Sequence, residues 1–364
     1  MAKKKESTGI IKVDTAAGSR SFNRLEMQVS QTLHMAIELY DSLNYLFILD
    51  HYDDITLFDL DAEPLAVSYY QLKTSDGAIT IDSAINENWI SKLYAQLSRP
   101  EGWLVRELGL ITNVPLEVKY KIESEKKRKL DRTDNLTSEH TLFSKLNPVV
   151  QERIRADIAE KFGITPDEVD LSKFAHLRTT LSVTSHRDLA EKEMSDFLFD
   201  KYPKITVETV KGIYAAMIEL LSRRQSYETM PEDAEFEEVW KHKGVTRDDF
   251  NRVIDQAISI SIPEYADIEN LLKPKEEDKA QVSLAYVTIA TDSNKRNNQA
   301  LYELFQMTQK TMKDHPFDGS RTVWEYCHEV ARDIRESNPL LCAPYDGLYI
   351  PTLVTCLLIN EARR

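Results

Sequence analysis

In the first third of the chain, the spacing of apolar residues changes from the period of a helix to that of strands. From Phe22 to Tyr40, apolar side chains recur every three or four residues, which predicts a helix with one buried stripe. Three runs rich in β-branched and aromatic residues follow, and turn residues separate them, so they predict a meander of strands. These runs are Tyr45–Asp50, Ile55–Leu60 and Ala66–Thr74.

Two further elements complete the pattern of an α/β sandwich. A second helix is predicted over residues 82–97, with Asp82 or Ser83 as its N-cap. The short apolar run Leu108–Thr112 is bounded by polar and proline residues, as expected of a buried strand. The segment Lys119–Arg132 is rich in Lys and Arg and poor in apolar residues, so it predicts an exposed connection that could contact phosphates or simply be solvated.

The remainder of the chain is dominated by helical periodicity. Phe174–Val183 alternates well enough to predict one more strand, and Lys243–Phe250 reads as a turn followed by a helix cap. Long helical patterns then run through Asp278–Thr291, Asn297–Met312, Arg321–Arg335 and Tyr349–Glu361. We therefore predict two domains, an α/β domain with helical additions over residues 1–225 and an all-helical domain for docking or oligomerisation over residues 226–364.

Composition and charge narrow the classes of protein. The 364 residues are 42% hydrophobic and 29% charged, as in soluble globular proteins, and no apolar run is long enough to span a membrane. The basic start of the chain has no apolar stretch of the signal-peptide kind, and the three cysteines are widely separated, so a reducing cytoplasm is expected. The net charge is -14, of which residues 226–364 carry -9, which leaves -5 for residues 1–225. The N-terminal part is thus the better surface for a nucleic acid.

The predicted meander carries the candidate chemistry. Gln71 and Lys73 alternate along one strand and so share one of its faces, and Asp54 opens the preceding antiparallel strand. One Mg²⁺ or Mn²⁺ ion could be held there by Asp54, the amide oxygen of Gln71 and a backbone carbonyl such as that of Leu72. Lys73 would orient or help to deprotonate an attacking water and offset negative charge on a phosphate.

A glutamine in place of glutamate lowers the charge of this ligand set by one, so a further carboxylate is desirable. Glu26 on the first helix and Asp50 at the end of the first strand are the candidates for a catalytic or metal-binding role. A competing interpretation is that these acids are ordinary turn residues and that Lys73 only solubilises a strand end. No P-loop, dinucleotide-binding, esterase or zinc-protease motif occurs, so any dependence on ATP must come from another protein.

The order of these segments resembles a family of endonucleases that serve as effectors of bacterial antiphage systems. The segments that carry the resemblance are Leu25-Glu26, DHYDDI, YYQLKT, GLITNVPL, FAHLRTTLSV and KGVTRDDF. The resemblance implies a restriction-endonuclease-like PD-(D/E)xK core, a mixed sheet flanked by helices, with a Q-x-K form of the motif. It places the acidic motif residue at Asp54, with Asp53 as the alternative, and the other motif positions at Gln71, Lys73 and Glu26.

Members of this family occur in effectors of cyclic-oligonucleotide signalling and as the nuclease subunit of Lamassu-type complexes built around an SMC-like ATPase. The resemblance therefore implies a cytoplasmic, Mg²⁺-dependent endonuclease of double-stranded DNA that acts in antiphage or anti-plasmid defence. It also implies an SMC-like or other ATPase partner and a homo-oligomer in the active state. Two alternatives stay open, a non-catalytic subunit that binds DNA or a partner through a nuclease-like fold, and a sensor of a small nucleotide through the C-terminal domain.

Overall fold

The chain forms two compact units in the computed structural model. One unit holds the described residues up to Met194 together with Ala216–Phe250, and the other holds Ser195–Ala215 and the residues from Asn251 onward. The single boundary after residue 225 that we derived from the sequence remains a prediction. The structure describes residues 17–123, 129–203, 205–231, 233–293, 299–345 and 347–363.

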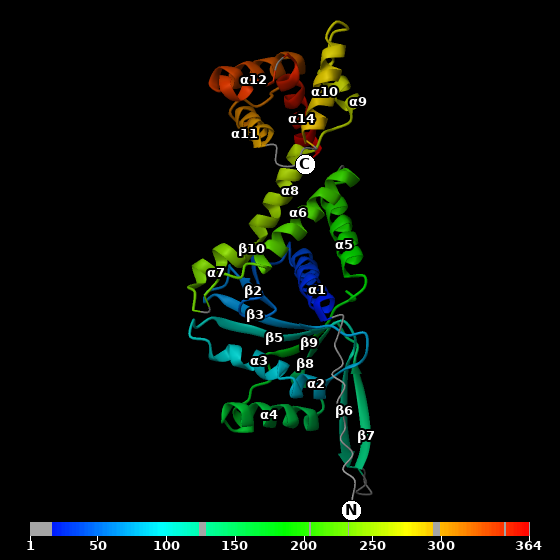
Figure 1. The fold of residues 1–364 in the computed structure, drawn as a ribbon, viewed down its shortest axis with the longest axis vertical. Helices are drawn as coiled ribbons and strands as arrows, with labels where there is room; N and C mark the ends of the chain where they lie inside the picture. The colour runs from blue at the N-terminus through cyan, green and yellow to red at the C-terminus, as the bar shows by residue number, and fades with distance from the viewer. Residues whose placement is uncertain are drawn as a thin grey trace, which may run out of the picture. The chain divides into compact units, whose positions relative to one another are not determined.

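The first unit is built on a seven-stranded mixed sheet with the strand order β10-β1-β2-β3-β5-β9-β8 (Figure 1). The inner strands β3, β5 and β9 run parallel to one another, and all other neighbours pair antiparallel. The strands are β1 Tyr45–Leu49, β2 Ile55–Asp59, β3 Ala66–Lys73, β5 Leu104–Thr112, β8 His140–Leu142, β9 Phe174–Arg178 and β10 Gly244–Thr246. The predicted meander and the mixed sheet are confirmed.

Helices cover both faces of this sheet, which explains why its central strands are apolar on both sides. On one face, Met35 of α1 and Leu39, the residue after α1, line the same cavity as Leu57 and Tyr70 of the strands. Helices α2, α3 and α4 enclose the opposite face in one apolar core with Leu108 and Leu110. The helices with residues in this unit are α1 Ala17–Glu38, α2 Ile81–Asn86, α3 Trp89–Ala95, α4 Pro148–Phe162, α5 His186–Lys201, α6 Val207–Gln225, α7 Phe236–Lys243 and α8 Arg247–Ile260, with 3-10 turns η1 Gln96–Ser98, η2 Phe143–Lys145 and η3 Pro166–Glu168.

Three predictions about local structure need correction. The helix expected over residues 82–97 is two helices, because Asn88 takes a left-handed φ of 63° between α2 and α3. The strand expected over Phe174–Val183 ends at Arg178. Strand β10 comes from the segment read as a turn and a cap, and it pairs with β1.

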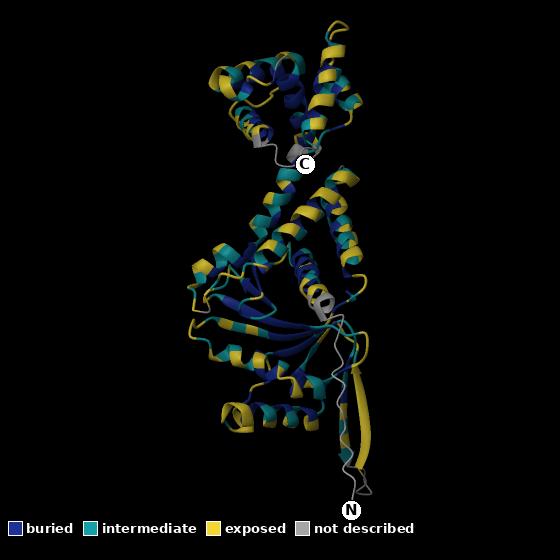
Figure 2. Ribbon diagram, viewed as in Figure 1, coloured by how far each residue is buried: buried dark blue, intermediate teal, exposed yellow. Residues whose placement is uncertain are grey.

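The segment Lys119–Arg132 is not a simple connection, since it falls within a β-hairpin. Strands β6 Leu116–Glu123 and β7 Lys129–Leu136 pair antiparallel, and β6 also pairs with the short strand β4 Ile79–Thr80. Alternating charges hid the period-two pattern of Val118, Tyr120 and Ile122. The prediction of exposure is right for β7, which Figure 2 shows as exposed along most of its length. Residues 124–128, which hold the densest basic run, lie outside the described residues.

The second unit contains helices and their connections throughout its described residues. The four helices predicted here from the sequence are present, although residues 297 and 298 at the start of one lie outside the described part. Their common core includes Leu304, Tyr326, Val330, Ile350 and Leu353. The helices are α9 Tyr265–Leu272, α10 Lys279–Ser293, α11 Gln299–Asp314, α12 Val323–Ser337, α13 Pro339–Cys342 and α14 Tyr349–Arg363. In the part of the chain that the structure describes, no helix is long and apolar enough to cross a bilayer.

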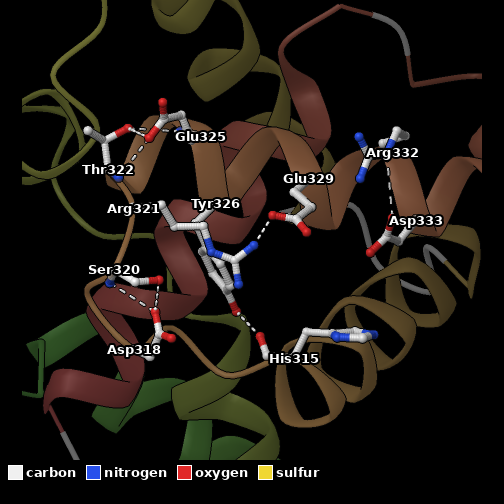
Figure 3. Close-up of polar contacts among 10 residues, drawn as sticks. All are labelled: His315, Asp318, Ser320, Arg321, Thr322, Glu325, Tyr326, Glu329, Arg332 and Asp333. Carbon is white, nitrogen blue, oxygen red and sulfur yellow. Dashed lines mark hydrogen bonds and ion pairs between the residues drawn. The ribbon is translucent and has the colours of Figure 1, made fainter.

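Polar contacts fix the start of α12 (Figure 3). Thr322 and Glu325 form a capping box, in which each side chain satisfies a backbone N–H of the other residue. Arg321 forms an ion pair with Glu329 and lies over the ring of Tyr326, whose hydroxyl donates to the His315 carbonyl at the end of α11. These contacts hold the connection from α11 to α12 against the core of the second unit.

Candidate active site

A polar cavity of about 480 Å³ lies at the carboxyl end of strand β3. Its walls come from α1, from the turn before β2, from the end of β3 and from the segment that leads through β4 and α2 to α3. The residues that line it are Arg24, Gln28, Asp54, Leu72, Lys73, Thr74, Ser75, Ala78, Ile79, Ser83, Glu87 and Trp89. Carboxyl ends of strands are a common place for functional groups in α/β folds, because loops converge there around a rigid sheet.

Asp54 and Lys73 meet in this cavity. Ile55 pairs with Tyr70 across β2 and β3, so Asp54 comes level with the end of β3. Its Oδ2 atom accepts hydrogen bonds from the backbone N–H of Leu72 at 2.8 Å and from Lys73 Nζ at 3.2 Å. Each of the two side chains is 24% exposed. A carboxylate and an ammonium are therefore held side by side at a surface that a substrate can reach.

Neighbouring groups hold Lys73 and the loop after it in place. The ammonium of Lys73 lies 5.8 Å from the centre of the Trp89 ring, within the range of a cation–π contact. Asn113 forms a two-point contact with Ser75, accepting from its N–H and donating to its carbonyl, each at 2.9 Å. The wall of the cavity after β3 is thus fixed by the strand beside it.

Gln71 lies on the same face of β3 as Lys73, two residues before it. Its side chain is 5% exposed and does not line the cavity wall. Its Oε1 atom is buried and accepts no hydrogen bond from any described residue. Leaving such an oxygen unpaired costs about 1–3 kcal/mol. A bound cation is one group that would satisfy it.

The oxygen atoms at this place suit a hard divalent cation. Asp54 offers a carboxylate, Gln71 an unpaired amide oxygen and Leu72 a backbone carbonyl, and Mg²⁺ and Mn²⁺ prefer ligands of this kind. Among the described residues, no three His, Cys, Asp or Glu side chains gather into a cluster that could hold a metal. The candidate set thus depends on one carboxylate supported by neutral oxygens.

Asp53 does not line the cavity, and its side chain contacts the backbone of the turn and Gln96 instead. Its carboxylate accepts from the N–H of Asp54 at 2.9 Å and from Gln96 Nε2 at 3.2 Å. Gln96 also donates to the carbonyl of Tyr52 at 2.7 Å, and Arg99 donates to Gln96. Burial raises the pKa of Asp53 to about 7, and the neighbouring charge of Asp54 adds to this increase. Asp53 therefore supports the turn that presents Asp54.

We expect Asp53 to make the protein less stable as the pH rises from 3.8 to about 7. Its pKa in the folded state, about 7, lies above the ordinary value of 3.8, so the folded state binds more protons between these values. The free energy of unfolding should then fall by about 1.4 kcal/mol for each pH unit within this window. Urea titrations between about pH 4 and pH 8 will measure this slope. The variant Asp53→Asn should flatten it, and an unchanged slope in that variant would exclude Asp53 as its source.

Glu26 and Asp50, the two further carboxylates predicted from the sequence, do not line the cavity. Glu26 lies on α1 between Arg24 and Gln28, which do line it, and forms an ion pair with Arg187. Asp50 is exposed and has a left-handed φ of 51° in the turn after β1. The structure therefore brings Asp54 and Lys73 together, buries Gln71 on the same face of β3 as Lys73, and holds Glu26 and Asp50 outside the cavity wall.

Sequence reasoning missed Glu87, the other carboxylate that lines the cavity. Glu87 is the residue after α2, and α2 begins directly after β4. The helix cap at Thr80 could have revealed it. A helix that starts a few residues after the carboxyl end of β3 brings the chain back past that end, where the cavity lies. The same return of the chain explains why Ser83 of α2 and Trp89 of α3 also line the cavity.

Comparison with known proteins gives one match in sequence. No family model matches the chain. Over 285 residues the chain is 27% identical to the Lamassu protein LmuA of Bacillus cereus (strain VD014), a stretch that covers 77% of this chain and 76% of LmuA. The match spans most of both proteins.

Solved structures give weaker likenesses. The Cap4 SAVED/CARF-domain containing receptor of Acinetobacter baumannii with the cyclic trinucleotide 3'3'3'-cAAA has a TM-score of 0.37 and 14% identity, and the match covers 70% of this chain and 45% of the receptor chain. The Moraxella osloensis Cap4 receptor has a TM-score of 0.39 and 13% identity, over 78% of this chain and 67% of that chain. Scores this low do not establish a shared fold.

Proposed function

We propose that this chain is a metal-dependent DNA endonuclease of a Lamassu-type antiphage defence system. The observation that carries the proposal is the contact between Asp54 and Lys73 in an open polar cavity at the end of β3, with the unpaired amide oxygen of Gln71 behind it. The similarity to LmuA over most of both chains supports the Lamassu part of the proposal.

A restriction-endonuclease-like core is part of the same proposal. In such a core, an acid at the start of one strand and a Q-x-K pair at the end of the next converge on a scissile phosphate. Here the acid precedes β2, the Q-x-K pair ends β3, and the two strands are antiparallel neighbours in a mixed sheet with helices on both faces. This arrangement is consistent with the motif, and the residue roles that follow are proposals.

Each residue would have its own role in the hydrolysis of a phosphodiester. Asp54, the Gln71 amide and the Leu72 carbonyl would hold Mg²⁺ or Mn²⁺, which when bound supplies Lewis-acid polarisation of the phosphate and lowers the pKa of water. Lys73 would orient the attacking water and, as an ammonium, offset negative charge on the phosphate. The hydrogen bond from Leu72 N–H keeps the Asp54 carboxylate aimed at this place. Glu87 offers a further carboxylate on the facing wall.

The substrate and partners are proposed from the resemblance and the similarity to LmuA. Double-stranded DNA is the proposed substrate, an SMC-like or other ATPase subunit the proposed partner, and the cytoplasm the proposed location. One site cuts one strand, so a double-strand break requires two copies of the site, which favours a homo-oligomer as the active state. Keeping the copies apart would then keep a toxic nuclease inactive.

Metal removal tests the proposal directly. We expect the purified full-length protein to nick or linearise supercoiled plasmid in Mg²⁺ or Mn²⁺ and to lose this activity in EDTA, because the hydrolysis depends on the cation. Gel electrophoresis of the plasmid measures the loss, and restored Mn²⁺ should restore cutting. Calorimetric titration with Mn²⁺, with and without DNA, separates this proposal from a non-catalytic subunit. Absence of metal binding in both titrations would favour that alternative and refute the nuclease proposal.

A further inference from the structure

Lys243 is a buried lysine at the junction of α7 and β10. Its side chain is 4% exposed. Its ammonium donates to three backbone carbonyls, those of Leu49 at 3.3 Å, Asp50 at 3.0 Å and Gln225 at 3.0 Å. The three N–H groups of a lysine are thereby all used, and within the described part of the chain no carboxylate pairs with this ammonium. A buried cation held only by carbonyls is costly, so a specific task for it is a reasonable expectation.

Two of the three carbonyls that Lys243 binds, those of Leu49 and Asp50, lie where β1 ends and the turn that presents Asp54 begins. Pairing of β10 with β1 reaches Ile48, opposite Gly244, and Lys243 continues the contact to the next two residues of the chain. The N–H of Asp50 donates to the carbonyl of Asp54 at 3.3 Å and closes the turn. Asp50 holds a left-handed φ, which L-residues adopt at some cost and which the surrounding contacts must maintain.

Gln225, whose carbonyl is the third acceptor of Lys243, also contacts α1, which forms part of the cavity wall. Gln225 Nε2 donates to the side chain of Gln28 at 2.6 Å and to the carbonyl of Leu25 at 3.2 Å, both on α1. Gln28 lines the cavity. Lys243 and Gln225 thus join the turn before Asp54 to the α1 wall.

The backbone next to Lys243 is itself fixed. A Cβ atom on Gly244 would lie 2.4 Å from the carbonyl oxygen of Trp240, so only glycine allows α7 to pass this close to β10. The backbone position of Lys243 is therefore tightly constrained, as it must be in a residue that positions another.

We propose that Lys243, together with Gln225, is a positioning residue for Asp54 in the hydrolysis of DNA, a role that rests on the function proposed above. Its ammonium holds the turn of residues 50–54 so that the Asp54 carboxylate stays beside Lys73. This assigns a task to the KGVTRDDF segment, which the sequence pattern marked only as a turn and a cap. Lys243 and Gln225 belong to the same compact unit as the cavity.

The test compares Lys243→Met with Val150→Ala in the full-length protein. Methionine fills the space without an ammonium, and Val150, a buried residue of α4, provides a core variant of reduced stability away from the turn. For Lys243→Met we expect kcat on plasmid DNA to fall about 10- to 100-fold with little change in KM, because misplacing a catalytic group by about 1 Å has effects of this size. Mn²⁺ affinity measured by calorimetry should fall with kcat. Val150→Ala should keep kcat and Mn²⁺ affinity near those of the wild type, even if its unfolding temperature falls as far as that of Lys243→Met.

Two further variants keep the outcome decisive. Gln225→Ala retains the carbonyl that Lys243 binds and loses only the contacts to Leu25 and Gln28, so it should fold and show a smaller fall in kcat. Equal kcat and Mn²⁺ affinity in Lys243→Met and Val150→Ala would overturn the proposal. If Lys243→Met does not fold, an unchanged kcat in Gln225→Ala would overturn it instead. Asp54→Asn distinguishes a failure of the proposed nuclease function from a failure of the positioning role of Lys243. If that variant still cuts DNA, the nuclease mechanism fails, whereas an inactive Asp54→Asn beside an unaffected Lys243→Met removes only the positioning role.

Discussion

Replacing Lys73 with alanine is expected to abolish metal-dependent degradation of plasmid DNA and to leave the fold intact. The ammonium is the cationic group that ends β3 inside the cavity, 3.2 Å from Asp54. Loss of the group that orients water and stabilises charge at the phosphate should lower kcat by about 10²- to 10³-fold. The free energy of unfolding should change little, because a partly exposed ion pair contributes about 0–1 kcal/mol. Plasmid-nicking rates and urea titrations on the same preparations measure the two effects.

Lys92→Ala provides a matched control for the Lys73 variant. Lys92 is an exposed lysine in the last turn of α3 and does not line the cavity, so its loss changes the net charge equally. Its nicking rate should stay near that of the wild type. Lys73→Ala that folds and still cuts within about tenfold of this control would remove Lys73 from the mechanism, since loss of one group that stabilises charge in the transition state costs at least about 100-fold.

Much of the α/β unit follows from the sequence. The strands β1, β2 and β3 were predictable because they combine β-branched and aromatic residues with short turns that hold poor strand formers such as Asp53, Asp54 and Pro64. Once the meander is known, alternation puts Gln71 and Lys73 on one face, and a short turn brings Asp54 to their level. Local pattern alone therefore predicts the proximity of Asp54 and Lys73.

The remainder of the site depends on contacts between distant segments. Residues 225 and 243 lie far along the chain from Asp50, and a lysine between a helix and a short edge strand has no periodic signal that marks it as buried. The hairpin of β6 and β7 was missed for a different reason, since charges on both faces conceal the alternation of Val118 and Tyr120. Glu26 was a plausible ligand by sequence order, but its ion pair with Arg187 depends on α5 packing beside α1, which one sequence does not specify.

Asp54→Asn is expected to remove both metal binding and DNA cleavage. Asparagine keeps the size of the side chain and an oxygen that can accept from Leu72 N–H, but it loses the one carboxylate of the candidate ligand set. Hard cations depend on such a charge, so Mn²⁺ affinity should fall below detection by calorimetry. The rate of plasmid nicking should fall by about 10³-fold or more, since loss of the carboxylate disturbs the cation and Lys73 together.

Asp53→Asn is the control that decides which of the two adjacent acids matters. The carboxylate of Asp53 is held by Gln96 and by the N–H of Asp54, and it does not line the cavity. Its asparagine variant should therefore bind Mn²⁺ and cut DNA at a rate within about tenfold of the wild type, a loss that a small shift of the turn can produce. The reverse result, an active Asp54→Asn and an inactive Asp53→Asn, would move the acidic motif position to Asp53. Because Asp53 lies behind the turn, the cation would then have to bind on the Gln96 side, and Lys73 would lose its place beside the ligand.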